Sequence, residues 1–138
     1  MTFVDTNVII DVFDKDPVWF RWSANALSAA AGLGAVIDAI VVAELGRNFD
    51  TLESLQSALG VMSMAVVPLD EASAFLAGTR FQGYRRNRGD DAIRRVLPDF
   101  FIGAHALTLG MSLLTRDPRL YRRYFPELTL ITPETEHD

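Results

Sequence analysis

Short apolar runs alternate along the chain with longer amphipathic stretches. The apolar runs predict short strands at residues 3–4, 35–37, 64–68 and 111–114, with a possible fifth at 128–130. Candidate caps and Gly/Pro punctuation predict helices at residues 8–13, 17–31, 40–45, from 52 onward, 71–80, 100–109 and 118–124. The polar stretch 82–97 is expected to begin as a loop. Strands that alternate with helices in this way favour an α/β sandwich around a parallel sheet.

The length of 138 residues fits a single domain over residues 1–138, with an acidic tail at 133–138 that we expect to fray. The chain has no cysteine, which excludes disulfides and Cys-based zinc or iron–sulfur sites. No export signal is recognisable at the N-terminus, and no apolar run reaches the ~20 residues that a membrane span requires. We therefore expect a soluble cytoplasmic protein without a membrane partner.

Charge is segregated along the chain, although the net value of −5 argues at first against a nucleic-acid partner. Residues 1–79 hold three basic and ten acidic groups, whereas residues 80–123 hold ten Arg and four Asp. Arg85, Arg86 and Arg88 lie in the densest part of this Arg-rich segment and are our candidates for binding RNA phosphates, because the guanidinium fork can bond two oxygens at once. The alternative is a solvated basic surface that balances the acidic first half.

Four carboxylates occupy positions that suit an active site. Asp5 directly follows the first predicted strand, and Asp117 follows the fourth. Active sites of open parallel sheets form at the carboxyl ends of their strands. Asp99 stands at the start of the helix that leads into the fourth strand. Glu44 lies in the apolar stretch 41–45, where an unpaired charge would be costly if buried.

A set of carboxylates is suited to a hard divalent cation. Mg²⁺ and Mn²⁺ prefer oxygen ligands in octahedral geometry. One or two such ions can lower the pKa of a bound water and brace the oxygens of a phosphodiester. The pattern therefore indicates hydrolysis of a nucleic-acid backbone, with the acidic cluster holding the metal and the Arg-rich segment holding phosphates.

Each carboxylate also has an ordinary structural role open to it. Asp5 could begin a turn, and Glu44 could pair with Arg47 at the i, i+3 spacing of a helix. Asp99 and Asp117 each adjoin a proline and could simply be helix N-caps. Only their joint placement points to one site.

Four motifs together resemble the PIN-domain family, and most closely the VapC-type toxins of type II toxin–antitoxin pairs. They are VDTNVII at 4–10, VAEL at 42–45, PDFFIGAHA at 98–106 and LLTRD at 113–117. The resemblance covers nearly the whole chain, with the motifs in the same order and spacing.

The resemblance implies a PIN-like (Rossmann-like) three-layer α/β sandwich with a central parallel sheet of about five strands. It implies a Mg²⁺-dependent endoribonuclease, with Mn²⁺ able to substitute, whose RNA substrate could be tRNA or rRNA. It also implies a homodimer and a cognate antitoxin. Matching positions carry the following roles: Asp5 and Asp99 as main metal ligands, Glu44 and Asp117 as third and fourth acids, and Thr6 and Thr115 as supporting hydroxyls.

Two features fall outside these motifs. The Arg-rich stretch 82–97 carries more charge than the motifs require. His105 lies six residues after Asp99, so at about 100° per residue it should face away from the metal. We predict that His105 is a core or interface residue.

Two other functions deserve comparison. A haloacid-dehalogenase-like phosphatase would need a second Asp where Asn7 stands and a late lysine, whereas Lys15 is the sole lysine. A catalytically silent PIN-fold module that binds a protein partner is the stronger alternative, although all four acids are present.

Overall fold

The computed structural model describes the backbone of residues 1–86 and 90–134, and the side chains of residues 1–86 and 95–134. Within these residues the strands are β1 (Thr2–Val4), β2 (Ala35–Asp38), β3 (Met64–Val67), β4 (Ser112–Leu114) and β5 (Leu130–Ile131). The helices are α1 (Thr6–Phe13), α2 (Phe20–Leu33), α3 (Ala39–Leu45), the 3₁₀ turn η1 (Gly46–Asn48), α4 (Leu52–Val61), α5 (Glu71–Arg85), α6 (Asp90–Thr108) and α7 (Arg119–Tyr124).

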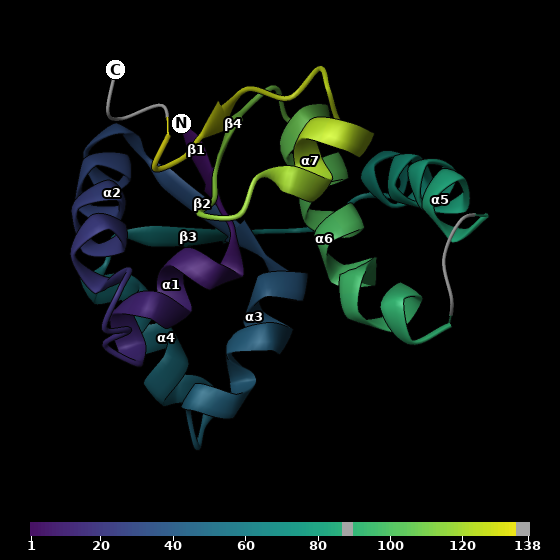
Figure 1. The fold of residues 1–138 in the computed structure, drawn as a ribbon. Helices are drawn as coiled ribbons and strands as arrows, with labels where there is room; N and C mark the ends of the chain where they lie inside the picture. The colour runs from purple at the N-terminus through teal and green to yellow at the C-terminus, as the bar shows by residue number, and fades with distance from the viewer. Residues whose placement is uncertain (87–89, 135–138) are drawn as a thin grey trace.

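The five strands form one parallel sheet in the order β3-β2-β1-β4-β5 (Figure 1). Phe3 of β1 is in register with Val36 of β2 on one side and Leu113 of β4 on the other. The chain builds outward from β1 to β3 and then returns to place β4 and β5 on the opposite side. The strand order therefore reverses between β1 and β4, where ligands bind in open parallel sheets.

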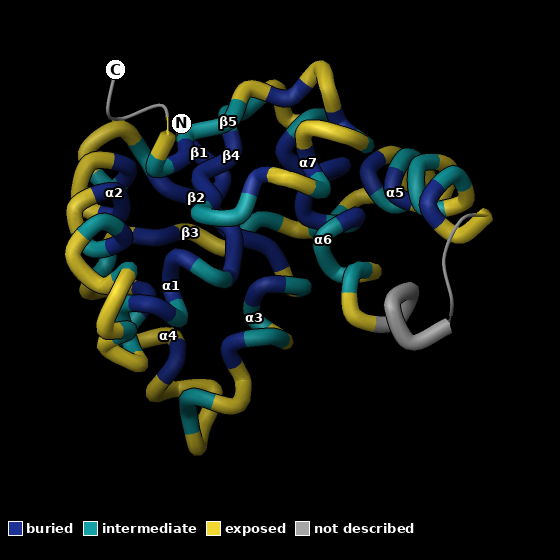
Figure 2. The backbone as a smooth tube through the Cα atoms, viewed as in Figure 1, coloured by how far each residue is buried: buried dark blue, intermediate teal, exposed yellow. Residues whose placement is uncertain are grey.

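Helices cover both faces of the sheet, as the α/β prediction required. The connections from β1 to β3 run across the sheet in one direction, and those from β3 to β5 run in the other. Because such crossovers are right-handed, the two groups of helices lie on opposite faces. Figure 1 accordingly shows α1 and α2 on one side of the strands and α5 and α6 on the other. The central strands are buried throughout, whereas the outer helical faces are exposed (Figure 2). Near-continuous burial explains why the strands read as short runs of apolar residues.

Several predicted boundaries are wrong. Helix α5 extends to Arg85, so the Arg-rich segment begins inside a helix and not in a loop. Helix α6 begins at Asp90 and contains Pro98, so Asp99 is an interior residue and not an N-cap. Pro98 suggested the start of a helix, but the helical turns before it continue through this residue. Helix α7 has Pro118 as its N-cap residue, with no side-chain capping bond.

The two ends of the chain correct smaller expectations. Helix α1 begins at Thr6, directly after Asp5, and β5 lies at 130–131 instead of 128–130. In the tail, residues 133–134 form a turn in which Glu134 bonds Arg122, while 135–138 lie outside the described residues. In the part of the chain that the structure describes, the helices are too short or too polar to cross a bilayer.

Candidate active site

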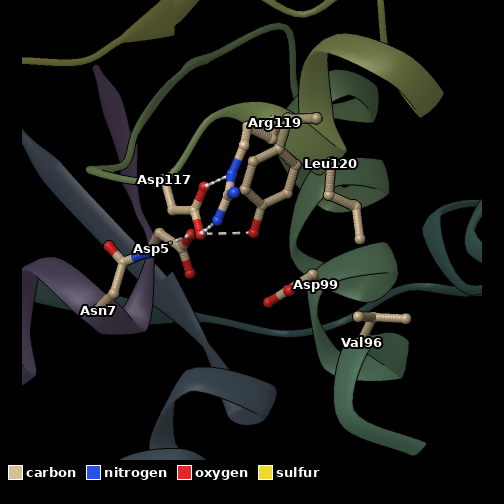
Figure 3. A pocket seen from close by; sticks show the side chains of 8 residues that line it. Asp5, Asn7, Val96, Asp99, Asp117, Arg119 and Leu120 are labelled. Atoms are coloured by element: carbon tan, nitrogen blue, oxygen red, sulfur yellow. Dashed lines mark hydrogen bonds and ion pairs between the residues drawn. The ribbon is translucent and has the colours of Figure 1, made fainter. Parts of the chain in front are cut away.

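A cavity of about 360 Å³ opens at the reversal point of the sheet. Asp5 reaches it from the end of β1, Asp117 from the loop after β4, and Asp99 from α6. Figure 3 shows these three carboxylates directed into the same space. The full lining is Asp5, Asn7, Val96, Asp99, Asp117, Arg119, Leu120 and Tyr121. Three of the four predicted acids are therefore brought together from separate elements.

Three side chains hold the Asp5 carboxylate through one of its oxygens. Oδ2 accepts hydrogen bonds from Thr115 Oγ1 at 2.9 Å, Tyr121 Oη at 3.0 Å and Asn7 Nδ2 at 3.3 Å. The backbone N–H of Asp5 donates to Leu114 O at 2.9 Å and so ties the residue to β4. Asp5 thus occupies a fixed position where the first and fourth strands end.

Burial and mutual repulsion raise the pKa of two of the acids. Burial raises the pKa of Asp5 to about 6, against hydrogen bonds from Thr115 and Tyr121 that lower it, and the Glu44 charge adds to the rise. Burial raises the pKa of Asp99 to about 8, with further contributions from the charges of Asp5, Glu44 and Asp117. No described side chain donates a hydrogen bond to the Asp99 carboxylate, so its charge lacks compensation.

Glu44 lies beside the cavity and does not line it. Its Oε1 accepts a hydrogen bond from Thr6 Oγ1 at 2.7 Å, and its charge contributes to the raised pKa of both Asp5 and Asp99. The Glu44 side chain is half-buried. The apolar sequence around it suggested deeper burial, but only Val41 and Leu45 of α3 are buried.

Pairing of Glu44 with Arg47 is not what the structure shows. Arg47 lies instead 3.8 Å from Asp14, and both of these side chains are largely exposed. The local alternative for Glu44 is therefore wrong, and its closest partner is the Thr6 hydroxyl.

Asp117 differs from the other acids because it has a basic partner. Its carboxylate accepts two hydrogen bonds from Arg119, at 3.0 and 3.2 Å, and this guanidinium lowers its pKa. The backbone N–H of Asp117 donates to Thr115 Oγ1 at 3.2 Å. Asp117 is thus held by its neighbours and is already neutralised in part.

The two predicted supporting hydroxyls each contact a predicted acid. Thr115 donates to Asp5, and Thr6 donates to Glu44. Thr115 is fully buried, so its hydroxyl has little access to solvent. Both positions fit a supporting role, which stays a prediction.

Besides the apolar Val96 and Leu120, sequence reasoning missed three polar lining residues: Asn7, Arg119 and Tyr121. Asn7 read as an ordinary turn residue. Tyr121 follows Asp117 by four residues, a spacing that would place the two on one side of a helix, and this is the signal that could have found it. Its contact with Asp5 spans 116 positions, which local patterns cannot show.

His105 is a core residue, as predicted. Its ring is buried, and Nδ1 lies 2.8 Å from the buried Asp38 Oδ2, while Nε2 lies 3.8 Å from Asp70. Asp38 also accepts hydrogen bonds from the first backbone amides of α3, those of Ile40 and Val41. His105 therefore links α6 to the start of the helix that carries Glu44.

Two of the predicted RNA-binding residues, Arg85 and Arg86, do not line the cavity. Arg85 ends α5 and Arg86 follows it, and both are exposed. Arg88 lies outside the described residues. Arg80, earlier on the same helix, instead pairs with Glu127 at 2.5 Å. Exposed basic residues are thus available at the end of α5, but no observation assigns RNA to them.

The carboxylate oxygens that line the cavity are the type of donor that a hard divalent cation prefers. Among the described residues, no three His, Cys, Asp or Glu side chains are grouped closely enough to hold one ion directly. Mg²⁺ usually keeps several waters and takes only one or two carboxylates. Asp5 and Asp99 line one cavity, and the charge of Asp5 raises the pKa of Asp99, a repulsion that a divalent ion would relieve. These two residues are the candidate ligands.

The fold has many solved relatives. A total of 29 chains of solved structures match this chain, and three of them are described here. One is a chain of VapBC2 from Rickettsia felis, bound to a DNA fragment from its promoter (21% identity, TM-score 0.67, covering 95% of this chain and 97% of that chain). The others belong to a toxin–antitoxin complex from Klebsiella pneumoniae (22%, 0.68, 96% and 98%) and to FitAcB from Neisseria gonorrhoeae (20%, 0.65, 97% and 99%).

A search of curated proteins found no match. The model of the PIN domain family, in contrast, matches residues 2–126, which includes every strand except β5 and all four candidate acids. With the sheet order and the shared carboxylate cavity on the same chain, this match is decisive: the protein belongs to the PIN domain family.

Proposed function

We propose that this protein is a Mg²⁺-dependent endoribonuclease and the toxin of a type II toxin–antitoxin pair. The observation that carries the proposal is the convergence of Asp5, Asp99 and Asp117 on one cavity, where burial and repulsion raise the pKa of the first two. Family membership supports nuclease chemistry, and the similar structure from Klebsiella pneumoniae is named as a toxin–antitoxin complex.

Each acid has a distinct part in the proposal. Asp5 and Asp99 would hold the ion, and Glu44 and Asp117 would act as the third and fourth acids around it. When bound, Mg²⁺ supplies an activated water and positive charge that stabilises the phosphodiester as it is attacked. Manganese is expected to substitute, because it prefers the same oxygen ligands.

The remaining residues position the acids and the substrate. Thr115 donates to Asp5 and also accepts from the Asp117 backbone, so it couples two acids. Thr6 donates to Glu44 and orients it toward the cluster. Arg85, Arg86 and Arg88 would bind RNA phosphates, since guanidinium groups bond phosphate oxygens in pairs. We further propose an RNA substrate, with tRNA and rRNA as the candidates, a cognate antitoxin, a homodimer and a cytoplasmic location.

The test is cleavage of labelled RNA by purified protein with Mg²⁺ or Mn²⁺. We expect cleavage that stops when EDTA is added and that falls at least about 100-fold in Asp99→Asn, because one metal ligand is lost. Asp50→Asn is the matched control, since Asp50 is exposed and is not among the residues that line the cavity. It should cleave like the wild type.

The alternative, a catalytically silent PIN-fold module, predicts another result. A folded wild-type protein that cuts no RNA with either metal, yet binds a protein partner, would replace the nuclease proposal with this one. Mapping cut sites across total RNA after expression would then identify the substrate of an active enzyme.

A further inference from the structure

Tyr121 places its hydroxyl on the first candidate metal ligand. The side chain is 1% exposed, and its hydroxyl donates to Asp5 Oδ2 at 3.0 Å. A buried phenol needs a hydrogen-bond partner, and the partner here is a carboxylate that lines the cavity. The contact joins the end of β1 to α7, two elements far apart in the sequence.

The oxygen that Tyr121 contacts is the one that other side chains also hold. Thr115 and Asn7 donate to the same Oδ2, at 2.9 and 3.3 Å. Among the described residues, Oδ1 receives no hydrogen bond from a side chain. Three donors on Oδ2 fix the rotation of the carboxylate and therefore also fix the direction in which Oδ1 points. A partner of this kind orients a ligand and tunes its affinity for metal.

We propose that Tyr121 is a positioning residue for the divalent ion, acting through Asp5. The inference rests on the proposed function, because it needs Asp5 to be a metal ligand. The phenol holds Oδ2 and so fixes the orientation of the carboxylate that, with Asp99, would hold the ion. In this proposal Tyr121 acts only through Asp5 and is not itself a metal ligand.

A glycine in α6 allows Tyr121 to reach this position. A Cβ at Gly103 would lie 2.9 Å from the Phe125 ring and 3.1 Å from the Tyr121 ring. Because real Cβ atoms essentially never lie within 3.0 Å of another heavy atom, a side chain at 103 would force the Phe125 ring to shift and would crowd the Tyr121 ring. Gly103 lies one turn after Asp99 on the same helix. One helix therefore supplies an acid and also the surface on which the phenol of Tyr121 is seated.

The chain offers a matched control in Tyr124. This residue lies on the same short helix, and its hydroxyl is also buried, but it contacts no hydrogen-bond partner among the described residues. Tyr124→Phe removes a buried hydroxyl from α7 without touching Asp5. Tyr121→Phe removes the hydroxyl that contacts it.

The experiment is calorimetric titration of Mn²⁺ into wild type, Tyr121→Phe and Tyr124→Phe without RNA. We expect Mn²⁺ affinity to fall about 10-fold in Tyr121→Phe, at the lower end of the loss typical for such partners, and to stay unchanged in Tyr124→Phe. Equal affinities in all three proteins would overturn the role of Tyr121 and leave the nuclease proposal intact. A wild type that binds no Mn²⁺ would overturn both.

The metal dependence of cleavage separates positioning from general damage to the fold. In Tyr121→Phe the Mn²⁺ concentration for half-maximal cleavage should rise about 10-fold, while the rate at saturating Mn²⁺ returns to near the wild-type value. A lower maximal rate with an unchanged metal dependence would contradict the inference. Thermal unfolding in EDTA checks that both Phe variants are folded before the titration.

Discussion

At the scale of single residues, the candidate site is a balance between burial and charge. Asp5 and Asp99 are held where ionisation is costly, whereas Asp117 is stabilised by Arg119. Like charges that share a poorly solvated site raise one another's pKa. The fold therefore maintains an unfavourable cluster, which is typical of functional sites and not of structures selected only for stability.

The pH dependence of stability follows from Asp99. Its pKa rises from 3.8 to about 8 on folding, so the folded protein binds its proton more tightly than the unfolded chain does. The stability that this proton provides is complete below about pH 3.8 and is lost as the pH rises toward 8. In EDTA, we expect Asp99→Asn to exceed the wild type in free energy of unfolding by about 1 kcal/mol or more at pH 8.

Urea denaturation of the two proteins at pH 5 and pH 8 checks this. The advantage of Asp99→Asn should shrink at pH 5, where Asp99 is protonated, and saturating Mn²⁺ at pH 8 should stabilise the wild type more than the variant. A difference that is the same at both pH values would show that repulsion in the cluster is not its source.

At the scale of elements, two helices and two strand ends assemble the site. Asp5 and Asp117 could be predicted because Asp5 directly follows β1, Asp117 lies in the loop after β4, and parallel strands end on one edge. The surroundings of Asp99 could not be predicted, because Pro98 suggested the start of a helix, whereas α6 begins before it, at Asp90. Tyr121 was missed for a different reason: its partner is fixed by the packing of α7 on α6, which local sequence does not encode.

Packing of α7 on α6 predicts the effect of Gly103→Ala. The new methyl group would meet the rings of Phe125 and Tyr121 at 2.9 and 3.1 Å, so these rings must give way. Overpacking of this kind costs about 1–3 kcal/mol of stability. We expect this loss in urea denaturation, together with weaker Mn²⁺ binding, because the Tyr121 hydroxyl moves from Asp5.

Gly78→Ala serves as the control for this substitution. It also changes a helical glycine to alanine, but no atom lies within 4 Å of its added Cβ. It should keep or raise stability, since alanine favours the helix by up to about 1 kcal/mol. If Gly103→Ala behaves like Gly78→Ala, the close contact between the two helices is not rigid.

At the scale of the whole molecule, charge and topology were both visible in the sequence. Alternating strands and helices predicted the parallel sheet, and the structure confirms it. The strand order could not be derived from the pattern, because it depends on which face each crossover covers. Charge segregation was equally plain, with ten Arg in residues 80–123 against three basic residues in 1–79. The effect of this charge segregation on RNA binding depends on the distribution of basic residues over the whole surface.

The last prediction tests whether the basic segment binds RNA. Replacing Arg85, Arg86 and Arg88 together with Ala should weaken RNA binding and reduce the slope of log affinity against log salt by about 2, since each lost single-strand phosphate contact contributes about 0.7. The matched control replaces all three basic residues of the first half, which changes net charge equally: Lys15, Arg21 and Arg47.

Binding is measured by fluorescence anisotropy across a salt series, with both triple variants made in the Asp99→Asn background to prevent cleavage. Equal losses in both triple variants would mean that only net charge matters, whereas no loss in the first would point to antitoxin docking as the purpose of this segment.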